Sequence, residues 1–193
     1  MQDLAIVVFA GPSLGGLVVG VIFRQPAKGG DIACAVMEGF HAIGAIDGLF
    51  ETCPSPWHKE IPRGLSKGIA FFGAASMGAL RAVELEPFGM IGTGRIVEGD
   101  DEVAVLHGPA EIGCPTLTEA LVNFRASLEQ ARGMGLVGSK DMPTLLRVAK
   151  SLFYKHRTRE RMLSAAAEAG VSGAIMDNLR RWLNENAGAR ITA

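Results

Sequence analysis

The chain has 193 residues, 48% of them hydrophobic, and a formal net charge of −1. A chain of this length and composition can bury a full core, so a single domain over residues 1–193 is expected. The balanced charge excludes nucleic acid and acidic membrane surfaces as primary partners.

Cysteine usage and the apolar N-terminus indicate the compartment. Cys34, Cys53 and Cys114 fall in no CxxC spacing and indicate no disulfide framework, which favours a reducing compartment. The apolar run LAIVVFA is short and is followed by Gly11 and Pro12, so it is neither a signal peptide nor a membrane span. The sequence therefore predicts a soluble, cytoplasmic protein with no membrane partner.

Four apolar runs in the first half of the chain are predicted as strands. They are residues 4–10, 18–24, 42–47 and 69–75. The runs are continuously apolar rather than alternating, which is expected when helices cover both faces of a mostly parallel sheet. The predicted fold class is therefore α/β, with a mostly parallel sheet core and flanking helices, and the strand order stays open.

Two helices are predicted around the fourth strand. The segment WHKEIPRGLSKG is typical of a short helix with Pro62 in its first turn and Gly68 at its C-terminal cap. The segment SMGALRAVELEP predicts a helix that ends at Pro87 and has Ser76 as its N-cap. Ser76 thus lies at a strand-to-helix turn.

The rest of the chain is predicted to be mainly helical. Residues 88–113 contain two short apolar pieces, GMIGTGRIV and EVAVLHG, that indicate further strands or ordered loops. From Pro115 a capping box at Thr116 and Glu119 predicts a long helix to Met134. Three helices follow, within 143–155, 158–170 and 172–188. We therefore expect an α/β core over 1–114 and a helical part over 115–193.

Three of the predicted strands end in segments that suit a binding site: GPS, IDG and GAAS. In an open α/β sheet, ligands bind outside the carboxyl ends of the strands. If the first, third and fourth strands are neighbours, Ser13, Asp47 and Ser76 line one edge of the sheet.

Ser76 resembles the serine of a nucleophile elbow, whose hydroxyl is exposed on a sharp turn while the next amide binds an oxyanion. The alternative is a plain N-cap serine. A nucleophile needs a base, for which the candidates are His58, Lys59 and His107. Carboxylates that could orient the base are Asp47, Glu60, Asp100, Asp101 and Glu102.

Each of these residues also has a structural interpretation. A lysine base must lose its proton near neutral pH, which burial beside Trp57 would favour. Otherwise Lys59 is an exposed lysine paired with Glu60 or another carboxylate, and His58 is a half-buried capping residue. The third interpretation is a metal site, although no HxxxH or HxH spacing supports it. Its ligands would be His58, Asp100, Asp101, Glu102 and His107.

A run of basic residues near the start of the last third admits two interpretations. It is a solvated helix face, or it docks an acidic partner protein. Its members are Lys150, Lys155, Arg157, Arg159 and Arg161.

Several of these segments together, in this order and spacing, resemble the TfuA-like family over residues 5–130. They are GPS at 11–13, PAKGGD at 26–31, IDG at 46–48, WHKEI at 57–61, GAASMGALRA at 73–82, FGMIGTG at 88–94, DDEVAVLHGP at 100–109 and EALVNFR at 119–125.

The resemblance implies a function and partners. It implies that the protein is a partner of a YcaO protein. YcaO proteins activate a peptide backbone amide with ATP so that sulfur replaces the oxygen. The implied activity is hydrolysis of a thiocarboxylate at the C-terminus of a ThiS-type ubiquitin-like sulfur carrier, with release of sulfide. No cofactor and no metal are implied.

The resemblance also implies roles for individual residues. Ser76 would attack the thioacyl carbon, Lys59 would accept its proton, and amides at the start of the following helix would hold the oxyanion. Supporting or substrate-binding roles fall to Ser13, Asp47, His58, Glu60, Ala75, Met77, Asp101 and His107. The competing interpretations are a non-catalytic adaptor that docks carrier and YcaO together, and an unrelated metal-dependent hydrolase.

Overall fold

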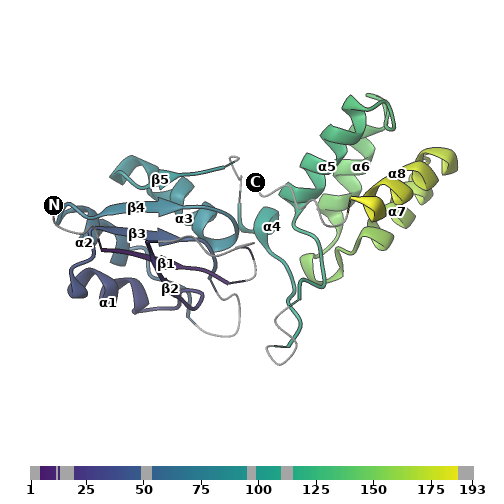
Figure 1. Cartoon of the computed structure of the whole chain (residues 1–193). Helices are drawn as coiled ribbons and strands as arrows, with labels where there is room; N and C mark the ends of the chain where they lie inside the picture. The colour runs from purple at the N-terminus through teal and green to yellow at the C-terminus, as the bar shows by residue number, and fades with distance from the viewer. Residues whose placement is uncertain are drawn as a thin grey trace. The chain divides into compact units, whose positions relative to one another are not determined.

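The computed structural model describes residues 5–11, 13, 20–48, 54–94, 99–109 and 115–186. Its contacts divide the chain into two compact units, Met1–Val103 and Ala104–Ala193 (Figure 1). This division lies before the boundary expected near residue 114, because the segment that precedes the long helix belongs with the helices. The assignment of the whole chain to one domain stays a prediction.

The first unit contains a five-stranded, fully parallel sheet. Its strands are β1 (Ile6–Phe9), β2 (Ile22–Arg24), β3 (Ala42–Ala45), β4 (Ala70–Gly73) and β5 (Ile91–Gly92). They lie in the order β2-β1-β3-β4-β5. The predicted α/β class and parallel sheet are confirmed, and each of the four predicted strands contains a shorter observed one. The first, third and fourth predicted strands are neighbours in this order, so the condition under which Ser13, Asp47 and Ser76 would share one edge is met.

Helices follow each strand after β1 in the described part of this unit. They are α1 (Asp31–Glu38), α2 (Glu60–Leu65), α3 (Ser76–Leu85) with the 3-10 turn η1 (Glu86–Phe88), and α4 (Asp100–Val103). The sequence analysis missed α1 and expected a strand or loop where α4 lies. Pro62 is the third residue of α2, which fits its expected place in the first turn.

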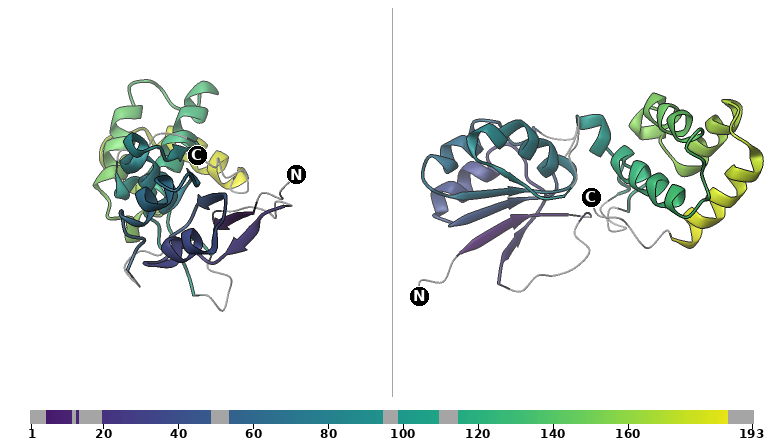
Figure 2. Two further views of the ribbon diagram at one scale, coloured as in Figure 1. Left: turned by 90° about the vertical axis from the view of Figure 1, so that its left-hand side faces the viewer. Right: turned by 90° about the horizontal axis from the view of Figure 1, so that it is seen from above.

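The helices pack on one face of the sheet (Figure 2). A Cβ on Gly64 of α2 would lie 2.5 Å from the ring of Phe71, and one on Gly73 would lie 2.8 Å from the Cβ of Ala82 in α3. On the opposite face Phe72 is 39% exposed. The expectation that helices cover both faces is therefore wrong for the described helices of this unit.

The second unit is a helical bundle, as expected. Its helices are α5 (Leu121–Gly133), α6 (Met142–Ser151), the 3-10 turn η3 (Tyr154–His156), α7 (Arg159–Glu168) and α8 (Gly173–Glu185). Fully buried leucines from four helices form its core: Leu128, Leu145, Leu163 and Leu179. Thr158 and Ser172 are the N-caps of α7 and α8, while Gly188 lies outside the described residues.

The expected capping box at Thr116 and Glu119 is wrong. Helix α5 begins at Leu121 with Ala120 as its N-cap. Thr116 instead pairs with His107 in an antiparallel bridge, and Glu119 forms an ion pair with Arg159. The backbone around Thr116 is therefore extended rather than helical, and the Glu119 side chain binds a distant arginine instead of a helix N-terminus.

The expected basic helix face is also corrected at Arg157. This side chain is fully buried, and its Nε donates to the carbonyl oxygen of Ala149 at 3.1 Å. Its Nη2 donates to the carbonyl oxygen of Leu152 at 2.9 Å. Arg157 thus satisfies the backbone at the end of α6 and is not part of a solvated face.

Candidate functional site

Ser76 lies on a strained turn between β4 and α3. Ala75 has φ 47° and ψ 168°, and Ser76 has φ 36°. These are the two non-glycine residues with positive φ in the described parts of the chain. Each such residue costs about 1–3 kcal/mol and is found mainly at functional sites, where the surrounding structure holds it in place.

Hydrogen bonds to β3 hold this turn. The N–H of Ala74 donates to the carbonyl oxygen of Ala45, and the N–H of Gly78 donates to that of Ile46, both at 3.1 Å. A Cβ on Gly78 would lie 1.8 Å from the Ala45 oxygen, so only glycine lets the helix start approach β3 this closely. The turn is thereby fixed at the carboxyl edge of the sheet.

The reactive groups of the turn are free of internal partners. Ser76 is the first residue of α3 rather than its N-cap, and its half-buried hydroxyl makes no hydrogen bond within the described residues. The N–H groups of Ser76 and Met77, in the first helical turn, likewise have no acceptor there. A hydroxyl beside two unpaired amides can attack a carbonyl carbon and bind the resulting oxyanion.

Asp47 organises the loop that follows β1. It is 4% exposed, and its Oδ2 accepts the N–H of Gly11 at 2.7 Å and that of Ser13 at 3.1 Å. The expected meeting of Ser13 and Asp47 at this edge is observed. Because this carboxylate oxygen accepts two backbone N–H groups, Asp47 fixes the position of the backbone at Gly11 and Ser13.

Glu60 performs a similar task for the neighbouring loops. It is 6% exposed, and its Oε1 accepts the N–H of Gly30 at 3.0 Å and that of Trp57 at 2.8 Å. Its Oε2 accepts the N–H of Ala33 at 3.0 Å. Glu60 therefore caps the N-terminus of α1 from a position about 30 residues further along the chain.

Lys59 and His58 lie on an exposed loop before α2. The Nε2 of His58 is 2.9 Å from the Oε2 of Glu84, and Arg81 hydrogen-bonds to the same carboxylate. Glu84 follows Ser76 by eight residues, which is about 12 Å along a helix axis. The Lys59 side chain is exposed and has no partner within the described residues.

The exposed position of Lys59 agrees with the second of its two expected environments, but neither expected neighbour of the lysine is observed. Trp57 is 68% exposed, so it does not bury the lysine, and Glu60 is occupied by backbone amides. No hydrogen bond joins Lys59 to Ser76 in the described structure. The proposed pairing of these two residues stays a prediction.

Lys28 is a second lysine at the carboxyl edge, one that the sequence analysis did not consider as a base. Ala27 forms a parallel bridge with Gly48, and a Cβ on Gly48 would lie 2.7 Å from the Cβ of Met77. Gly48 therefore lies between Ala27, which precedes Lys28, and Met77, which follows Ser76. The signal that could have found it is the segment PAKGGD, which directly follows the second strand.

The remaining predicted site residues are divided between the two units. Asp101 belongs to α4, where its N–H donates to Asp100 Oδ1 at 2.8 Å, and α4 packs against α3. Glu102 is 3% exposed. His107 lies in the second unit, in the bridge with Thr116. Among the residues that the structure describes, no group of three or more His, Cys, Asp or Glu side chains is placed to hold a metal ion.

A small cavity lies beside the turn. Its volume is about 200 Å³, and it is lined by β4, β5 and the face of α3 one turn after Ser76. The lining is mostly small: Gly73, Ala79, Ala82, Gly92, Thr93 and Gly94, with Val83 and Glu86.

The fold and the turn define an α/β protein with a parallel sheet and a serine at a strand-to-helix elbow. Comparison with known protein families matches residues 47–158, more than half of the chain, to the family described as TfuA-like protein. The chain belongs to the TfuA-like family, and this membership associates it with YcaO-dependent thioamidation. The matched segment includes Lys59 and Ser76. Lys28 lies outside it, because the match begins at residue 47.

A comparison with curated proteins found no match to this chain. Within the described residues, no helix is long and apolar enough to cross a membrane.

Proposed function

We propose that this protein hydrolyses the thiocarboxylate at the C-terminus of a ThiS-type sulfur carrier and releases sulfide for a YcaO partner. The observation that carries the proposal is the Ser76 turn, where a strained backbone presents an unbonded hydroxyl next to two amides without acceptors. Family membership supports the choice of sulfur chemistry. Soluble cytoplasmic action is part of the same proposal.

The reaction proceeds in two balanced steps. Ser76 Oγ attacks the thiocarboxylate carbon while a base takes its proton, the oxyanion binds the amides of the turn, and the C–S bond breaks. Sulfide leaves as HS⁻ with the proton that the base took from Ser76, and the carrier is held as an ester on Ser76. Water then attacks the ester carbon while the base takes a proton from it and passes this proton to Ser76 Oγ. The ester bond breaks, the Ser76 hydroxyl is restored, and the carrier is released as a carboxylate with one proton lost to solvent.

Two lysines are candidate bases. Lys59 follows from the family resemblance, and Lys28 follows from its position beside the strand ends that flank Met77. Asp47 and Glu60 would act by holding the loops that carry Ser13, Lys28 and Lys59, and His58 and Asp101 would shape the surroundings. His107 lies in the other unit, and its supporting role is part of the proposal.

The adaptor function is the alternative, and it is favoured by the exposed Lys59 side chain, which makes no hydrogen bond to Ser76 within the described residues. Sulfide release from a thiocarboxylated carrier, measured together with carrier binding, separates the two. Ser76→Ala should lower release by about 100-fold or more while binding persists, and Ser66→Ala, an exposed serine after α2, should change neither. If Ser76→Ala does not change sulfide release, the proposed hydrolase function is wrong and the adaptor function is favoured.

A further inference from the structure

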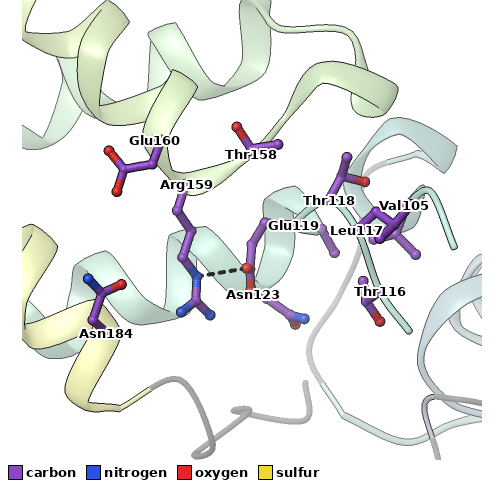
Figure 3. A pocket seen from close by; sticks show the side chains of 11 residues that line it. Val105, Thr116, Leu117, Thr118, Glu119, Asn123, Thr158, Arg159, Glu160 and Asn184 are labelled. Atoms are coloured by element: carbon purple, nitrogen blue, oxygen red, sulfur yellow. Dashed lines mark hydrogen bonds and ion pairs between the residues drawn. The ribbon is translucent and has the colours of Figure 1, made fainter. Parts of the chain in front are cut away.

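The helical unit contains its own polar cavity, apart from the Ser76 turn. Its volume is about 420 Å³, which is within the range of small-ligand sites. The walls come from the segment before α5, from α5 itself, from the start of α7 and from the end of α8 (Figure 3). Glu119, Ala120 and Asn123 of the segment EALVNFR line it, and the proposed hydrolysis assigns no role to this segment.

An arginine and a glutamate are fixed in the wall before any ligand binds. Arg159 Nε donates to Glu119 Oε2 at 2.9 Å, and Arg159 Nη1 donates to the carbonyl oxygen of Leu183 at 3.0 Å. The N–H of Glu119 donates to the carbonyl oxygen of Arg157 at 2.8 Å. These contacts join the segment before α5 to α7 and α8, so three parts of the helical unit hold the site.

Two carboxamides are open to a ligand. Asn123 lies in the first turn of α5 and Asn184 in the last turn of α8, and Figure 3 draws them on either side of the Arg159 guanidinium. Neither side chain makes a hydrogen bond within the described residues. Each offers one acceptor oxygen and two donor hydrogens.

The charges of the cavity are balanced. Arg159 is paired with Glu119, and Glu160 accepts from Arg180 Nε at 3.1 Å. A phosphate or another compact anion would need unpaired cations, which these walls lack. The free groups instead both donate and accept, as a ligand with alternating N–H and C=O groups requires.

We propose that this cavity binds an extended polypeptide segment through its backbone. The Asn123 and Asn184 carboxamides each exchange hydrogen bonds with a backbone amide of that segment, and Arg159 Nη2 donates to a backbone carbonyl between them. Leu117, which is 51% exposed at the cavity wall, supplies apolar contact for a side chain. The site lies within the helical unit, so its binding does not depend on Ser76 or on sulfur chemistry.

The test uses the full chain labelled with ¹⁵N. The probe is a mixture of short, acetylated and amidated peptides of varied sequence, and inorganic phosphate serves as the anion probe. The side-chain amide signals of Asn123 and Asn184 should shift with peptide in a saturable manner and stay unchanged with phosphate. No shift with peptide, or an equal shift with phosphate that displaces the peptide, would overturn the proposal.

Variants sharpen the assignment. Asn123→Ala and Asn184→Ala should each weaken peptide binding by about tenfold. Asn178→Ala, an exposed asparagine of the same α8 that does not line the cavity, should bind as the parent protein does. Ser76→Ala should also bind normally, which separates failure of this proposal from failure of the hydrolase. Equal weakening in Asn178→Ala would contradict the site.

Discussion

Gly78 in the first turn of α3 rests against the carbonyl oxygen of Ala45 at the end of β3, with no room between them for a side chain. A Cβ on Gly78 would lie 1.8 Å from that oxygen, and the obstacle is backbone. Gly78→Ala should therefore lower the free energy of unfolding by about 3 kcal/mol, since the helix must move away from the sheet. Denaturant unfolding measures this change.

Gly99 provides the matched control in the same unit. A Cβ there meets nothing within 4 Å, so Gly99→Ala should stay within about 0.5 kcal/mol of the parent protein. Equal stability of the two variants would show that α3 does not depend on this close approach.

The strained backbone at Ala75 predicts that a second substitution raises the free energy of unfolding instead of lowering it. The backbone of Ala75, with φ 47° and ψ 168°, suits glycine, so Ala75→Gly removes strain worth about 1–3 kcal/mol. The greater freedom of glycine in the unfolded chain offsets about 0.5–1 kcal/mol of this. We expect a net gain of about 1 kcal/mol in the free energy of unfolding.

Ala79→Gly is the control, because Ala79 lies inside α3 with helical backbone. Glycine there should cost about 1 kcal/mol. A loss of stability in Ala75→Gly as large as that in Ala79→Gly would contradict a strained turn.

Glu60 should be essential for the loops around α1. Glu60→Gln places an amide group opposite three N–H donors, so at least one hydrogen bond to a charged acceptor is lost, at a cost of about 2–3 kcal/mol. Hydrogen exchange at the amides of Gly30, Ala33 and Trp57 should accelerate. Glu86→Gln, on the exposed turn η1, should leave exchange at these amides unchanged; unchanged exchange in Glu60→Gln would refute the role.

An ion pair between the edge strand and α1 predicts a pH dependence. Arg24 Nη1 donates to Glu38 Oε1 at 2.9 Å, and this hydrogen bond to the charged carboxylate lowers the pKa of Glu38. Because the folded pKa is below the unfolded one, the pair stabilises the fold above the unfolded pKa. Its contribution is lost as pH falls through the folded pKa.

Both side chains are partly exposed, so the contribution is small. The difference in free energy of unfolding between the parent and Glu38→Gln should therefore shrink on acidification and with added salt. A difference that is constant from neutral to acid pH would contradict the assignment.

The sequence was informative where local pattern and tertiary structure agree. The apolar run that leads into GAASMGA predicted β4, and the small and apolar residues after it predicted α3. Both elements could be predicted because each depends on residues that are close together in the sequence. The parallel sheet could be predicted for the same reason. The strand order could be anticipated only as a condition on which Ser13, Asp47 and Ser76 would meet.

Residues whose local structure was predicted wrongly have partners far away in the sequence. Thr116 and Glu119 match a capping box, but they bind His107 and Arg159. Helix α1 has no side-chain cap of its own, because Glu60 supplies one from α2. No pattern within a short window contains such pairings.

The choice between Lys28 and Lys59 is the remaining prediction for the proposed hydrolysis. Lys59 is anchored through His58 to the far end of α3, whereas Lys28 follows Ala27, which pairs with Gly48 next to Met77. Both lysines are exposed, but only the backbone before Lys28 is joined to the Ser76 turn by these contacts. We therefore expect Lys28 to be the base and Lys28→Ala to lower the rate of sulfide release by about 100-fold or more. Lys59→Ala should lower it less, and Lys67→Ala, an exposed lysine after α2, should not change it. All variants should bind the carrier. A large loss in Lys59→Ala with normal release in Lys28→Ala would assign the base to Lys59, and it would require the loop before α2 to move toward Ser76 when the carrier binds.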